Sequence, residues 1–207
     1  MARHFRPLMG LLSLMLASCV LPTRVRADTI AFNDFGAGNS YSVSGLGIGG
    51  GSHLTQGGAF ISTATGEVSE IVTGIVVGTS LPGSGYTLNL YADNSNFPGS
   101  LLGSFGGSAP AAPGTSDILT PSSGVLLTSG QKYWLIASSS NDLNWRQNNQ
   151  SVIGPWYYHD GSGTTFVSST TLVAFKVLVS NVPEPSSIAL AVVAFAACLV
   201  VAARRAS

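Results

Sequence analysis

Residues 86–91 read Tyr-Thr-Leu-Asn-Leu-Tyr. In an extended chain the first, third and fifth side chains lie on one face and the others lie on the opposite face. The run at residues 132–137, Lys-Tyr-Trp-Leu-Ile-Ala, is almost continuously apolar, as is typical of a strand at the centre of a sandwich. These two stretches predict an all-β fold.

Similar short runs, bounded by glycine, proline and asparagine, recur along the chain, and no window shows a helical period. We expect strands at 29–35, 59–63, 68–77, 86–92, 101–105, 124–127, 132–138, 143–146, 156–159 and 172–179. Proline and glycine predict turns at 81–85 and 96–99. Residues 36–58 form a long glycine-rich connection and 108–121 an internal loop. The prediction is one antiparallel β-sandwich or jelly-roll-like domain over 28–181, flanked by an N-terminal signal helix and a C-terminal transmembrane helix.

The C-terminal segment has three parts in a fixed order. Val182-Pro183-Glu184-Pro185 comes first, residues 188–203 are uncharged and apolar, and Arg204-Arg205 follow at once. The apolar run predicts a membrane helix, although it is short against the roughly 17–25 residues of a usual span. The arginines predict a cytoplasmic end. The two prolines predict an extended, rigid segment before the helix.

The N-terminus predicts export. Arg3, His4 and Arg6 precede an apolar run at 8–20, and a small-residue site places cleavage between Ala27 and Asp28. An alternative stays open, because residues 16–19, Leu-Ala-Ser-Cys, have the form of a lipobox, in which Cys19 would be acylated. The predicted segments are therefore a signal peptide at 1–27, the exported domain at 28–181 and the C-terminal signal at 182–207.

Charge and cysteine content exclude some classes of partner and chemistry for the exported domain. Between 28 and 181 three basic residues stand against eight acidic ones, a formal charge of −5. Nucleic acid is therefore not an expected partner, because it requires a basic face. Both cysteines, Cys19 and Cys198, lie in the terminal segments, so the domain has no disulfide, thiolate nucleophile or cysteine metal site.

The C-terminal order of Val182-Pro183-Glu184-Pro185, apolar helix and Arg204-Arg205 resembles the PEP-CTERM sorting signal of Gram-negative bacteria. The resemblance covers residues 182–207. It implies recognition by an exosortase-type membrane protease, export through the general secretory machinery, and a final place at the cell surface or in an extracellular matrix of polysaccharide. The chain would be anchored at the inner membrane first.

Two stretches of the domain, 88–102 and 127–135 with Trp145, are similar to the choice-of-anchor β-domains, the R type in particular. That resemblance spans about residues 29–179. The family has no assigned catalytic residues, so it implies a surface domain of unknown ligand and no enzyme. No cofactor is expected.

Three sequence patterns have the residue types of possible sites. Residues 45–50 formally fit G-x-G-x-x-G, but the glycines that follow cannot begin the helix of a dinucleotide site, so we interpret a surface loop. Asp93, Asn94 and Asn96 are a weak calcium candidate, against an ordinary turn. His53 and His159 are the domain's only histidines, and no spacing selects a catalytic partner, which leaves a secreted hydrolase as a weak alternative.

The aromatic group around 145 and 156–159 is the candidate glycan-binding site. Sugar-binding faces combine flat rings, which cover C–H faces, with amides that bind hydroxyls. Trp145, Trp156 and Tyr158, interleaved with amides and carboxylates, fit a carbohydrate-binding module, the alternative function. The competing interpretation is that these rings pack in the core.

Overall fold

The computed structural model describes residues 28–111, 116–120, 124–162 and 165–180. The predicted signal peptide, the lipobox, the Pro-Glu-Pro motif and the apolar helix at 188–203 lie outside the described residues. Within the described part of the chain, no helix is long and apolar enough to cross a membrane.

The described chain is all-β, and its strand pairings are antiparallel. One sheet has the order β1-β14-β4-β8, with β9 also paired to β4. Its strands are β1 (Asp28–Asn33), β4 (Gly66–Thr73), β8 (Asp117–Leu119), β9 (Leu126–Leu127) and β14 (Phe175–Ser180).

A second sheet has six strands in the order β13-β12-β3-β10-β6-β7, and a short third sheet has the order β2-β11-β5. The six strands are β3 (Thr55–Ile61), β6 (Gly85–Asn94), β7 (Phe97–Ser108), β10 (Lys132–Ser138), β12 (Ile153–His159) and β13 (Thr165–Thr171). The third sheet contains β2 (Gly45–Ile48), β5 (Ile75–Val77) and β11 (Leu143–Arg146), and two short 3₁₀ turns lie at Ala37–Asn39 and Gly50–Ser52.

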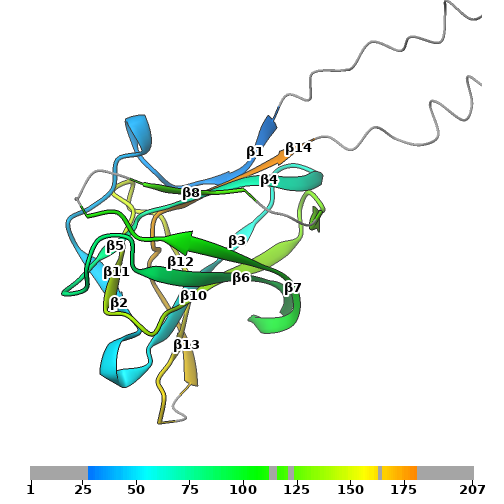
Figure 1. Ribbon diagram of the computed structural model, residues 1–207. Coiled ribbons are helices and arrows are strands. Elements are labelled where there is room, and N and C mark those ends of the chain that lie inside the picture. Colours follow the sequence, from blue (N-terminus) through cyan, green and yellow to red (C-terminus); the bar gives the residue numbers. More distant parts are fainter. Residues whose placement is uncertain (1–27, 112–115, 121–123, 163–164, 181–207) are drawn as a thin grey trace, which may run out of the picture.

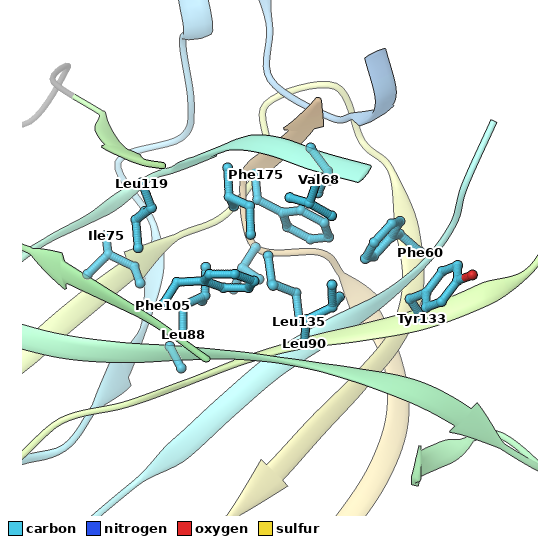
Figure 2. Packing of buried hydrophobic residues seen from close by; sticks show 14 of the residues in the cluster. Phe60, Val68, Ile75, Leu88, Leu90, Phe105, Leu119, Tyr133, Leu135 and Phe175 are labelled. Carbon is cyan, nitrogen blue, oxygen red and sulfur yellow. The ribbon is translucent and has the colours of Figure 1, made fainter. Parts of the chain in front are cut away.

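The β1 sheet lies over the six-stranded sheet (Figure 1), and apolar side chains from both sheets form one buried core cluster. Figure 2 shows Val68, Leu119 and Phe175 on one side of this core and Leu88, Leu90, Phe105 and Leu135 on the other. The prediction of an all-β, antiparallel sandwich is therefore confirmed for the described residues.

The alternation in residues 86–91 places the side chains as predicted. Tyr86, Leu88 and Leu90 are buried in the core, whereas Thr87 is exposed and Asn89 partly exposed. In β10 both faces are buried, because Tyr133 and Leu135 enter the core while Trp134 and Ile136 pack on the opposite side. This explains why the β10 sequence is continuously apolar.

The β6–β7 hairpin corrects the predicted turn at 96–99. Asn94 already pairs with Phe97, so Ser95 and Asn96 alone form the turn, with φ of 54° and 69°. Two successive residues of positive φ match the twist of paired strands, and asparagine tolerates this conformation better than most residues. Phe97 and Pro98 belong to β7.

The structure contains three strands that the sequence pattern does not predict, and it divides one predicted strand in two. The glycine-rich connection at 36–58 contains β2 and the start of β3, the loop at 108–121 contains β8, and β13 was not expected. The predicted strand at 68–77 is interrupted at Gly74. Before this residue β4 pairs in the β1 sheet, and after it β5 pairs in the three-stranded sheet. At Gly57 an added Cβ would lie 2.0 Å from the carbonyl oxygen of Leu135, so glycine is what lets β3 approach β10 so closely.

Candidate functional site

The aromatic run of β12 is divided between two faces of the six-stranded sheet. Trp156 pairs in register with Gly58 and Ser168, and Tyr157 pairs with Gly57 and Val167. Because side chains alternate along a strand, Trp156 and Tyr158 share one face, and Tyr157 and His159 share the other. The sequence run therefore does not form one continuous aromatic surface.

Trp156 and Tyr158 are the two sequence candidates that the structure brings together. Both are half-buried, and their ring centroids lie 5.6 Å apart with a tilt of 52° between the ring planes. The indole N–H of Trp156 donates to Oε1 of Gln56 at 3.2 Å, and the amide of Gln56 in turn donates to the carbonyl of Gly47. The two rings are therefore not coplanar and do not form one flat surface.

The placement of Trp145 corrects its assignment as a glycan-binding candidate. Its side chain has no exposed surface, and its ring packs edge-on against Phe175, with centroids 6.1 Å apart. Its indole N–H donates to the carbonyl oxygen of Ala174 at 3.0 Å. A buried indole with its single donor satisfied belongs to the core, and it presents nothing to a ligand.

The calcium candidates Asp93, Asn94 and Asn96 lie on the β6–β7 hairpin. One carboxylate oxygen of Asp93 accepts from the indole of Trp134 at 2.7 Å, and the other accepts from the backbone N–H of Asn96 at 3.3 Å. The side-chain oxygen of Asn96 accepts from the Lys132 ammonium. These oxygens accept hydrogen bonds from protein donors, one of which is the lysine ammonium. The arrangement is therefore that of a turn held by side-chain hydrogen bonds.

The two histidines are separated by the fold. Nδ1 of His159 lies 2.7 Å from the hydroxyl of Thr165 across the β12–β13 hairpin. His53 lies in the left-handed conformation after the 3₁₀ turn at Gly50–Ser52, beside a hollow of about 590 Å³ that is lined by Thr55, Thr87 and residues 138–140. The G-x-G-x-x-G stretch is the strand β2 followed by this turn, which has no helix N-terminus to hold a pyrophosphate.

A second aromatic cluster was not predicted from the sequence. Tyr91, Trp134 and Tyr157 come from three strands of the six-stranded sheet and lie on its side away from the core. Trp134 has no exposed surface, whereas Tyr91 and Tyr157 are partly exposed above it. Burial raises the pKa of the Tyr157 phenol, and the neighbouring Tyr91 raises it further. The alternation of side chains along β10 is enough to place Trp134 and Leu135 on opposite faces of the sheet. Which tyrosines lie beside Trp134 depends on the register of the neighbouring strands.

Two buried polar groups have strongly shifted pKa values. Asp34 is 1 % exposed, and burial raises its pKa from 3.8 to about 7. One of its oxygens accepts from the backbone N–H of Phe175 at 2.8 Å, and the other finds no hydrogen-bond partner among the described residues. Burial likewise raises the pKa of Tyr86, whose hydroxyl donates to Asp117 at 2.7 Å and contacts the hydroxyl of Thr73 at 3.0 Å. Both groups connect strands of the sandwich.

Comparison of the chain with known protein families and with curated proteins finds no match.

Proposed function

We propose that this chain is a non-enzymatic exported protein that an exosortase-type system sorts to the cell surface or to an extracellular polysaccharide matrix. The observation that carries the proposal is the order Val182-Pro183-Glu184-Pro185, apolar run, Arg204-Arg205. Export signals at both ends and a cysteine-free domain between them support the same conclusion.

The position of the first and last described strands in the sandwich is compatible with this route. Asp28, the residue after the predicted cleavage site, is the first residue of β1 and pairs with Ser180, the last residue of β14. Cleavage after Ala27 would leave β1 whole. β14, the last described strand before the predicted sorting signal in the sequence, lies beside β1 in the same sheet (Figure 1). The first and last strands of the described domain are therefore neighbours in one sheet.

The sorting motif is tested by replacing Pro183, Glu184 and Pro185 with alanine in the native host. Alanine favours helix, so the apolar helix would extend through the motif and the extended substrate of the protease would be lost. We expect the variant to insert normally and to accumulate at the inner membrane as a longer form, as seen by fractionation and blotting.

The matched control replaces Ser186 and Ser187 with alanine, which changes the adjoining residues and leaves the motif whole. The control should be processed like the wild type. Equal processing and surface delivery of the Pro-Glu-Pro variant would refute sorting by this motif and would leave an ordinary membrane anchor.

The second candidate function is a carbohydrate-binding module, which is favoured by partly exposed aromatic side chains beside amides on the six-stranded sheet. Trp156 and Tyr158 are the sequence-predicted part of this set, and the structure adds Gln56, which accepts from the Trp156 indole. In this function the domain would hold the protein in the extracellular polysaccharide after export. Retardation of the protein in gels that contain polysaccharide would test it, with Trp156→Ala and Tyr158→Ala as variants.

A further inference from the structure

The side of the six-stranded sheet that faces away from the core is here called the outer face and is defined by Tyr91, Trp134 and Tyr157. Trp134 is the direct neighbour of Tyr91 on β6 and of Ala59 on β3. Tyr157 on β12 is the neighbour of Gly57 on β3. The three aromatic residues therefore form a band across four adjacent strands.

Three buried side chains, here called the floor, lie at the base of this band. Ala59, Trp134 and Ile136 are buried, and Tyr91, Tyr157 and Val167 pack against them while staying partly exposed. Gly57 and Ala59 carry little or no side chain, which leaves room above β3 for the rings on either side. The indole of Trp134 is held by Asp93 at 2.7 Å. The two tyrosines thus rest on a rigid base, which lowers the conformational entropy lost when a ligand stacks on them.

Hydroxyl and amide groups lie beside this band. Asn89 is on the same face as Tyr91 and accepts a hydrogen bond from Ser104 at 2.6 Å. Thr87 and Ser138 are direct neighbours in the next row, and both line the hollow of about 590 Å³ with Thr55. On the other side of the band Thr165 bonds His159 at 2.7 Å. The outer face therefore combines phenol rings with neutral donors and acceptors.

The charged groups of the outer face already have protein partners. Asp93 accepts from Trp134 and from the backbone of Asn96, and the Lys132 ammonium donates to Asn96. The whole exported domain has a formal charge of −5. A polyanion would therefore meet a negative protein, and the described residues of this face include no cluster of basic side chains. A neutral sugar chain instead offers C–H faces to the rings and hydroxyls to the amides.

We propose that the outer face binds a neutral polysaccharide, with sugar rings stacking on Tyr91 and Tyr157 and hydroxyls bound by Asn89, Thr87 and Ser138. This inference rests on the proposed function, in which the domain works among extracellular polysaccharide. It assigns the site to a different face from Trp156 and Tyr158.

The test is affinity electrophoresis of the full-length protein, purified in a detergent that contains no sugar. The gels contain dextran, hydroxyethyl cellulose or, as an anionic comparison, alginate. We expect retardation by at least one neutral polymer and none by alginate. Tyr91→Ala and Tyr157→Ala should each raise the dissociation constant at least tenfold, and Asn89→Ala severalfold. Ile118→Ala, at an exposed position of β8 in the other sheet, should change it less than twofold.

Each variant is first checked by circular dichroism and thermal unfolding. Should Tyr91→Ala unfold, Tyr157→Phe and Asn89→Ala retain the floor and still remove polar contacts from the face. The proposal is overturned by retardation in no neutral polymer, by stronger retardation in alginate, or by loss of binding in Tyr158→Ala alone. It is also overturned if Tyr157→Ala abolishes self-association instead, which would make the face an interface between copies. None of these results bears on processing of the Pro-Glu-Pro motif, so the two proposals fail separately.

Discussion

The buried carboxyl group of Asp34 should make the stability of the sandwich depend on pH. Its pKa rises from 3.8 in the unfolded chain to about 7 in the folded protein, because burial disfavours the charged form. The folded state therefore binds this proton more tightly than the unfolded chain does. The stabilisation is complete below about pH 4 and is lost as the pH rises to about 7.

The magnitude follows from the two pKa values. Each pKa unit corresponds to about 1.4 kcal/mol, so a rise from 3.8 to about 7 corresponds to roughly 4 kcal/mol of unfolding free energy. Asp34→Asn keeps a neutral group of the same size, and its carbonyl oxygen can still accept from Phe175. The variant should therefore match the wild type near pH 4 and exceed its stability at pH 8 by up to about 4 kcal/mol.

Urea unfolding followed by tryptophan fluorescence between pH 4 and pH 8 measures this difference, since Trp145 is buried beside Phe175 and reports loss of the core. Asp28→Asn, which removes an exposed carboxylate at the start of β1, the strand that ends directly before Asp34, controls for the change in net charge. Other groups titrate in both proteins, so the difference between wild type and variant isolates Asp34. Parallel stability curves for the wild type and Asp34→Asn would refute a buried, raised carboxyl group.

Two further predictions concern packing and are checked by the same unfolding measurement. An added Cβ at Gly107 would lie 2.1 Å from Cζ of Tyr86, so Gly107→Ala should destabilise the protein by about 1–3 kcal/mol. Gly106→Ala meets no atom within 4 Å and should be nearly neutral, and equal effects would contradict the Tyr86 placement. Trp145→Ala empties a fully buried site and should cost about 3–5 kcal/mol. Trp156→Ala, at a half-buried position, should cost clearly less, and the reverse order would contradict the assignment of Trp145 to the core.

Several features of the fold could be predicted from the sequence because they depend on neighbours along the chain. The alternation in residues 86–91 and the apolar run at 132–137 identify β6 and β10, and the bounds of β10 and β11 are as predicted. These strands carry β-branched, aromatic and aliphatic side chains, whose local pattern alone specifies an extended, buried segment. The export and sorting signals are likewise local patterns, and they stay predictions.

Tertiary structure alone decided the strands that lack such a pattern. β2 and the start of β3 are rich in glycine and become strands because β10 and β11 supply their hydrogen-bond partners. Hairpin register placed Ser95 and Asn96 at the turn instead of the more obvious Pro98 and Gly99. Local propensity favours a turn at proline and glycine, but pairing of Asn94 with Phe97 outweighs it.

The candidate site shows the same division. The sequence candidates Trp156 and Tyr158 lie two residues apart and share one face of β12, whereas Tyr157 between them lies on the other face. Which of those faces carries Tyr91 and Trp134 depends on the pairing of β6, β10, β3 and β12, whose members are far apart in the sequence. The sequence by itself determined that the domain would be a β-sandwich rich in aromatic side chains. Which rings became core and which became surface was settled by strand order and register, because burial is a property of neighbours in space.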